Sequence, residues 1–308
     1  MGTVHKLIER HGVATARGMA DSSIDLLAIN AAASVMSEEE TRLGITHAGF
    51  AMTNLPHKRI EDAVWRRQGI NTTLLVEAGH DKAGALIGVP YGSLARLILL
   101  YLQTQAIRTG SQEVELGGNM KVWLERMGLQ RGGRTYQLVT EQARRISRCR
   151  LTFYSETDKG EAWQSGAFVK GGISMAGVVD GDQQRLWQDR VLLDDGFWQS
   201  LQAHPVPVRE EAIQAISTRS VAIDLYIWLA YRLHALSKPT PITWLALHAQ
   251  FGAGFALVKH MKPKFLEALT LALAVYPEAR VEVTEKGLTL YPSAPAVPKA
   301  EARRIGIA

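Results

Sequence analysis

Apolar residues recur at helical spacing in two similar series of segments along the chain. The first series predicts three helices, over 93–110, 119–129 and 134–149. The second series predicts three more, over 220–236, 244–252 and 254–276. A short strand near 113–116 follows the first helix, and a β-hairpin over 279–292 closes the second series. The order helix, strand, helix, turn, helix, hairpin is typical of a winged helix, and here it occurs twice.

The remaining pattern predicts further strands and one N-terminal helix. Residues 24–40 have the spacing of an amphipathic helix, which could pack on the rest of the chain or pair with another copy. Strands are predicted at 72–78, 150–155, 166–180 and 185–193. We therefore expect an α+β fold with two tandem winged-helix domains. Its expected parts are an N-terminal helical or flexible segment (1–54), winged-helix domain 1 (55–204), winged-helix domain 2 (205–292) and a flexible tail (293–308).

Composition places the chain among soluble globular proteins. It has 308 residues, of which 46% are hydrophobic and 21% are charged, enough for two domains with their own cores. Cys149 is the only cysteine, which excludes a disulfide framework within the chain and suits a reducing compartment. The N-terminal segment has no continuous apolar stretch typical of a signal peptide, and no apolar run approaches the roughly 20 residues of a membrane span. We expect a cytoplasmic protein without a membrane partner.

The net charge of +5 is unevenly distributed along the chain. Residues 55–155 carry +7, residues 156–212 carry −5, and residues 213–291 carry +3. Two basic blocks separated by an acidic block favour a nucleic-acid-binding protein with two contact regions.

The predicted helix over 134–149 has two distinct faces. At about 100° per residue, an apolar arc forms the expected core side, with Leu138, Val139, Gln142, Ala143, Ile146 and Cys149. The opposite arc contains Arg134, Gln137, Glu141, Arg144, Arg145 and Arg148. Solvated helices usually intersperse acids with bases, but here Glu141 is the only acid on this arc. The arc is either a solvated face or a DNA-contacting face. The candidate DNA-binding residues in this region are Arg131, Arg134, Thr135, Gln137, Arg144, Arg145 and Arg148.

A second cationic cluster lies in the predicted helix over 254–276. Its members are Lys259, His260, Lys262 and Lys264, and Lys286 at the hairpin turn is a further candidate phosphate contact. Pro263 lies among the lysines, so the helix is expected to kink or to restart there. A solvated lysine edge explains this cluster nearly as well as DNA contact does.

Catalytic and cofactor motifs are missing from the sequence. It contains no GxxxxGK[ST] loop, no GxGxxG between a strand and a helix, and no HExxH. Asp180, Asp182, Asp189, Asp194 and Asp195 form an acidic stretch, but their spacing fits no calcium-binding loop. We expect a protein without catalytic activity, cofactor or metal.

Several long segments resemble the plasmid-encoded RepA replication initiators, the RepA C-terminal family. They are LPHKR (55–59), GVPYGSLARLILLYLQTQAIRTGSQEVELG (88–117), WLERMGL (123–129), EQARRISRCRLTF (141–153), PVPVR (205–209), IDLYIWLAYRL (223–233), LHAQFG (247–252) and VYPEARVEV (275–283). Together they span about 43–292 in order. Pro263 departs from the resemblance, which implies an arginine-rich run without proline at this place.

The resemblance implies a bacterial plasmid replication initiator that binds repeated, iteron-type sequences of its double-stranded origin DNA. It implies that the protein helps to open the duplex and recruits host replication proteins, namely DnaA and the replicative helicase. It further implies a balance between monomer and homodimer. The alternative is a winged-helix transcriptional repressor without an initiator role.

Overall fold

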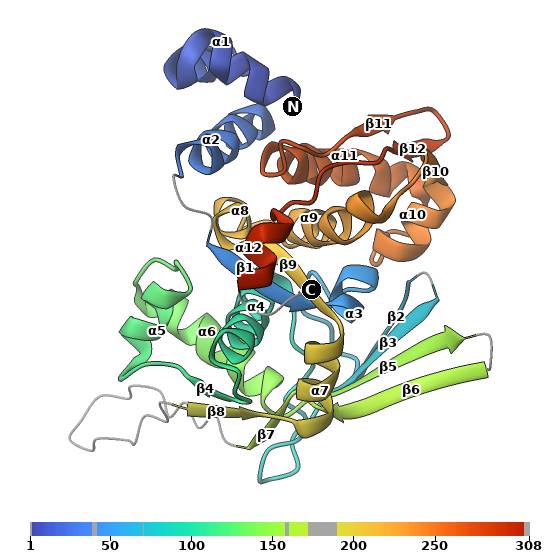
Figure 1. Cartoon of the computed structure of the whole chain (residues 1–308). Helices are drawn as coiled ribbons and strands as arrows, with labels where there is room; N and C mark the ends of the chain where they lie inside the picture. Colours follow the sequence, from blue (N-terminus) through green and yellow to red (C-terminus); the bar gives the residue numbers. More distant parts are fainter. Residues whose placement is uncertain (1, 39–41, 70, 158–159, 172–189, 305–308) are drawn as a thin grey trace. The chain divides into compact units, whose positions relative to one another are not determined.

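The computed structural model describes residues 2–38, 42–69, 71–157, 160–171 and 190–304 (Figure 1). Helices and mainly antiparallel sheets alternate along the chain, which confirms the α+β class. The contacts divide the chain into two compact units. The central unit comprises Ile45–Gly49 and Thr53–Pro205, and the terminal unit comprises Met1–Gly44, Phe50–Met52 and Val206–Ala308. The domain limits expected from the sequence stay a prediction, because units defined by contacts need not fold independently.

The first helical series forms the helical part of the central unit. Its helices are α4 (Gly92–Thr109), α5 (Met120–Arg126) and α6 (Gly133–Ile146), with β4 (Glu113–Glu115) after α4. These elements confirm the predicted ones to within three residues at each end. Gly110 ends α4 in the left-handed conformation with φ 64°, which glycine adopts without steric cost. A further helix, α7 (Asp195–Ala203), is capped by Asp194.

The strands of the central unit form two sheets (Figure 1). The first sheet has the order β2-β3-β5-β6, with β2 at Val64–Gln68, β3 at Thr72–Glu77, β5 at Arg150–Thr157 and β6 at Gly160–Ala167. The second has the order β4-β8-β7, with β7 at Val169–Gly171 and β8 at Arg190–Leu193. The strand after α6 therefore pairs with β3 and β6, while β4 pairs with β8. The strands predicted over 166–180 and 185–193 lie partly in 172–189, outside the described residues.

The second helical series builds the terminal unit. Its elements are α8 (Glu210–Ala215), α9 (Ser220–Arg232), a 3-10 helix (Leu233–Ala235), β10 (Thr240–Thr243), α10 (Trp244–Phe251), α11 (Val258–Ala274), β11 (Val281–Val283) and β12 (Gly287–Leu290). The predicted hairpin is confirmed as β11-β12, and β12 also pairs with β10. Phe265 of α11 lies in the core. The centroid of its ring is 5.8 Å from that of Trp244 and 5.7 Å from that of Phe251.

Helix α11 continues through Pro263 without a break. Proline has no N–H group to bond to the carbonyl four residues earlier, and within a helix it costs about 3 kcal/mol. Met261 and Phe265 are buried on either side of Pro263, so packing holds both turns in place. The expected restart near Pro263 is therefore wrong, the expected kink stays a prediction, and the cationic residues of this segment lie on one helix.

The N-terminal segment contains α1 (Thr3–Gly18) and α2 (Ser23–Ser37). Helix α2 corresponds to residues 24–37 of the predicted helix over 24–40, whose last two residues lie outside the described ones, and it packs on α8 and α11 of the terminal unit. Helix α1 contacts α2, and its buried His5 has Nε2 2.8 Å from the carbonyl oxygen of Ala274. Near the other end of the chain, α12 (Lys299–Arg304) buries Ala302. Strands β1 (Leu43–His47) and β9 (Pro205–Arg209) form a separate two-stranded sheet.

His47 gives the central unit a pH-dependent stability. Its Nδ1 accepts a hydrogen bond from the backbone N–H of Gly49 at 3.0 Å, and its Nε2 lies 2.8 Å from Ser200 Oγ. Burial, with a smaller effect of His204, lowers the pKa of His47 to about 4. Since an unfolded histidine titrates near 6.5, the unfolded chain binds the proton first, and the contribution of His47 to stability is lost as pH falls from 6.5 toward 4.

We expect His47→Asn to reduce the loss of stability between pH 7 and pH 4.5. The measurement is the free energy of unfolding in urea at several pH values, for the wild type and the variant. Parallel pH profiles of the two proteins would show that His47 is not responsible.

Candidate nucleic-acid interface

The exposed face of α6 carries most of the cations that the sequence places there. Arg134, Arg144 and Arg148 are exposed, as is Gln137, while Thr135 is half-buried. The side chains predicted to face the core do so for Val139, Gln142, Ala143, Ile146 and Cys149. Leu138 is a correction, because 37% of it is exposed. The helix therefore has two faces, as predicted, with Leu138 at the exposed edge of the apolar one.

Arg145 is a second correction, since only 5% of it is exposed. Its Nη2 and Nε donate to Glu141 Oε1 at 2.8 and 3.1 Å, and its Nη1 donates to the carbonyl oxygen of Val89 at 3.0 Å. Its guanidinium also lies over the ring of Tyr91, 5.1 Å from the centroid. Arg145 thus fixes α6 to the segment before α4, and in this conformation it does not reach a ligand.

The segment that covers Arg145 is shaped to receive it. Gly88 has φ 89°, and a Cβ atom there would overlap the Arg145 guanidinium. The backbone N–H of Tyr91 donates to Gln142 Oε1 at 2.9 Å, so Gln142 and Arg145, about one turn of α6 apart, both hold this segment. The sequence of α6 alone does not indicate which segment of the chain covers Arg145.

Ion pairs leave two arginines of this face without a charged partner. Arg131 pairs with Glu125, and Arg144 Nη2 lies 3.3 Å from Asp81 Oδ2. Within the described parts of the chain, no ion pair involves Arg134 or Arg148. At the start of α6, Gly132 supplies no side-chain cap, so the first backbone N–H groups lack the partner that a capping side chain provides. Unpaired arginines and open helix N–H groups on one surface suit an anionic ligand.

The second cluster is less uniform. Lys259 and His260 are exposed in the first turn of α11, and Lys286 is exposed at the turn between β11 and β12. Lys264 pairs with Glu267 at 2.9 Å, and the half-buried Lys262 has its ammonium 4.7 Å from the centroid of Trp244. Lys259, His260 and Lys286 are therefore the cations of this region that remain most available.

The sequence matches the family described as "Plasmid encoded RepA protein" over residues 89–244, about half of the chain. The chain belongs to the plasmid-encoded RepA family. The matched region contains α6 with its arginines, while α11 lies beyond it. No curated protein sequence matches this RepA-family chain.

The solved structures that resemble this RepA-family chain include two of RctB domains 2 and 3. A crystal structure of selenomethionine derivatives of domains 2 and 3 of RctB has a TM-score of 0.52 and 10% identity, and the match covers 82% of this chain and 97% of that one. A crystal structure of RctB domains 2–3 has a TM-score of 0.41 and 10% identity, with 78% and 93% covered. At 10% identity the first likeness shows a shared fold only, and the second adds no argument.

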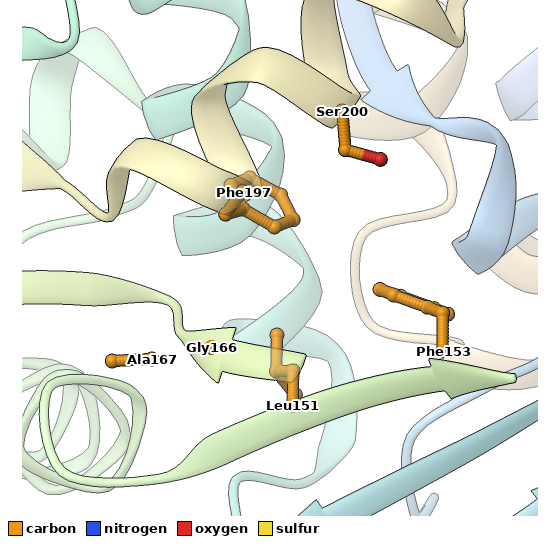
Figure 2. A pocket seen from close by; sticks show the side chains of 6 residues that line it. All are labelled: Leu151, Phe153, Gly166, Ala167, Phe197 and Ser200. Atoms are coloured by element: carbon orange, nitrogen blue, oxygen red, sulfur yellow. The ribbon is translucent and has the colours of Figure 1, made fainter. Parts of the chain in front are cut away.

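The central unit contains a small cavity that no residue of α6 lines (Figure 2). It is lined by Leu151, Phe153, Gly166, Ala167, Phe197 and Ser200. Its volume is about 10 Å³, room for about one water molecule. The cavity is thus too small for an organic substrate.

The described residues contain no group of three or more His, Cys, Asp or Glu side chains that could hold a metal ion. None of their helices is both long and apolar enough to cross a lipid bilayer. Asp180, Asp182 and Asp189 of the acidic stretch lie outside the described residues.

Cys149, next to the arginines at the end of α6, is predicted to be chemically inert. It is buried, and burial raises the pKa of its thiol to about 12, so the reactive thiolate is almost absent at neutral pH. A thiol reagent such as DTNB at pH 8 should label the unfolded chain stoichiometrically and leave the folded protein unlabelled for at least an hour. Rapid labelling of the folded protein would contradict this burial.

Proposed function

We propose that this protein initiates replication of a plasmid by binding double-stranded origin DNA sequence-specifically through α6 and α11. Membership of the plasmid-encoded RepA family supports the initiator role. The observation that carries the DNA-binding part is the exposed arginine face of α6 and of the turn after it, where Arg134 and Arg148 have no ionic partner in the described structure. The candidate helix lies within the region that matches the family.

Both units would be winged helices in this proposal. In the terminal unit, the order α9, β10, α10, α11, β11, β12 and the sheet β10-β12-β11 support this assignment. In the central unit, the order α4, β4, α5, α6 supports it, with β7 and β8 in the place of the hairpin that pairs with β4. The third helix of such a unit enters the DNA major groove. These third helices are α6 and α11.

Helices α6 and α11 would contact different grooves of the DNA. Arginines of α6 would bond to guanine edges and phosphates, for which the planar guanidinium fork is suited. Lys259 and His260 of α11 and Lys286 of the hairpin would bind phosphates of a second groove. A protein that fills two major grooves reads a site of about two helical turns, which fits repeated, iteron-type origin sequences. Opening of the duplex and recruitment of DnaA and the replicative helicase would follow, without catalysis by this chain.

The deciding experiment asks whether the gene supports replication of a plasmid that carries its cognate origin and no other. We expect transformants with the intact gene and none with a copy interrupted by an early stop codon. Binding to the same DNA without replication, together with repression of a reporter gene, would favour the transcriptional repressor.

A separate assay tests the absence of catalysis. Supercoiled origin DNA incubated with the protein and Mg²⁺ or Mn²⁺ should stay supercoiled. Nicking that co-purifies with the protein would instead indicate an enzyme that cuts its origin.

A further inference from the structure

Residues 79–87 form a small hairpin against the end of α6. Backbone hydrogen bonds from Asp81 N–H to the Ala85 carbonyl (2.9 Å) and from Ile87 N–H to the Gly79 carbonyl (2.9 Å) close it. A bridge between His80 and Leu86 lies between these two bonds. A Cβ atom at Gly79 would overlap the carbonyl oxygen of Arg148, so the base of the hairpin packs directly on the end of the helix. The 79–87 hairpin is therefore fixed relative to the arginine face.

The hairpin holds the Asp81 carboxylate in one orientation. Its Oδ1 accepts hydrogen bonds from the backbone N–H groups of Ala83 (2.9 Å) and Ala85 (3.0 Å). These bonds, with the nearby Arg144, lower the pKa of Asp81, so the group stays charged at neutral pH. The second oxygen, Oδ2, is left to accept from Arg144 Nη2 at 3.3 Å. Unlike a carboxylate on a free side chain, that of Asp81 is held beside Arg144 by the backbone of its own hairpin.

This arrangement matters more for DNA than for stability. Both partners are partly exposed, with 57% of the Arg144 side chain and 29% of the Asp81 side chain accessible, and such pairs stabilise proteins little. Toward random DNA, however, Asp81 cancels the charge of Arg144 and repels a phosphate that approaches it. The guanidinium has five N–H donors and gives one to Asp81, so it can still donate to a guanine edge.

We propose that Asp81 is a specificity-determining residue, which lowers the affinity of α6 for random DNA and orients Arg144 toward a base of the cognate site. The inference rests on the proposed function, since it assigns a role within DNA recognition by α6. It adds a carboxylate that no sequence pattern places near the DNA.

The test compares the full-length wild type with Asp81→Asn. Asparagine keeps an oxygen for the Ala83 and Ala85 N–H groups, so the hairpin persists while the charge is lost. The probes are a random-sequence 30-bp duplex and a cognate duplex, obtained by selection with the wild type from a randomised pool. Because one phosphate contact changes the salt slope by about 0.9, we expect random binding to tighten about five- to tenfold at 0.1 M salt with a slope steeper by about 0.9. Cognate affinity should change less than about twofold.

Two controls separate the local effect from net charge. Asp195→Asn removes a carboxylate that pairs with Lys170 on another element, and should leave the specificity ratio unchanged. When Arg144 is already replaced by alanine, Asp81→Asn should have little effect on the affinity for random DNA. The substitution acts by freeing the charge of Arg144, and that charge is absent in this background.

The outcomes separate this inference from the function on which it rests. If Asp81→Asn changes the affinities for the random duplex and the cognate duplex by the same factor, or changes neither affinity, Asp81 does not determine specificity. If the wild type selects no sequence and binds no duplex, the proposed DNA binding itself fails.

Discussion

Replacing Arg134, Arg144 and Arg148 together by alanine is expected to abolish most of the DNA affinity and to leave the fold intact. All three side chains are exposed, those of Arg134 and Arg144 on α6 and that of Arg148 two residues beyond its end, and none is part of the core. Each phosphate contact contributes about 0.9 to the slope of log affinity against log salt, so the slope should fall by about 2 to 3. At 0.1 M salt this corresponds to a loss of about two to three orders of magnitude. Fluorescence anisotropy with an origin duplex at several salt concentrations measures both quantities.

A charge-matched variant makes this result specific to α6. Lys6, Arg10 and Lys299 are exposed cations of α1 and α12, and their replacement by alanine removes the same net charge. This control should change the slope by less than about 1, because its cations lie outside both candidate helices. Equal effects of the two triple variants would reduce the arginine face to a solvated helix surface. Circular dichroism of both variants checks that helix content is unchanged.

Much of this face could be predicted from the sequence because a helix repeats every 3.6 residues. The wheel separates Arg134, Arg144 and Arg148 from Val139 and Ile146 without any knowledge of the rest of the chain. It fails at Arg145, because burial of that side chain depends on a segment about 55 residues earlier in the sequence. A local sign did exist, since Glu141 lies one turn before Arg145.

The pairing of the strands is even harder to predict from local sequence than the burial of Arg145. Alternation predicts the strand over 72–78, but it does not indicate that β3 pairs with β5, which is far along the chain. β2 lies in a stretch whose proline and basic residues obscure the pattern, and its pairing with β3 provides what propensity does not. Pro263 was misleading for a related reason, since packing of its neighbours outweighs a local cost. Long-range contacts explain each of these differences.

The core role of Arg145 leads to the second large effect. Arg145→Ala should lower the free energy of unfolding by about 2–4 kcal/mol, since it removes the buried partner of Glu141 and the donor to the Val89 carbonyl. Arg145→Lys should restore little, because an ammonium cannot bond to both groups with the geometry of the guanidinium fork. Arg144→Ala, one residue away on the exposed face, should change stability by less than about 0.5 kcal/mol. Urea unfolding followed by circular dichroism gives the three values.

Salt dependence then distinguishes positioning from contact. Arg145 does not reach a ligand, so below the unfolding transition Arg145→Ala should weaken DNA binding with an unchanged salt slope, because α6 loses its fixed orientation while its phosphate contacts persist. Arg148→Ala should instead flatten the slope by about 0.9 without changing stability. A flattened slope with normal stability in Arg145→Ala would mean that Arg145 leaves its buried site and binds DNA directly. The comparison of Arg145→Ala with Arg148→Ala thus distinguishes a residue that holds the recognition helix in place from a residue that contacts DNA.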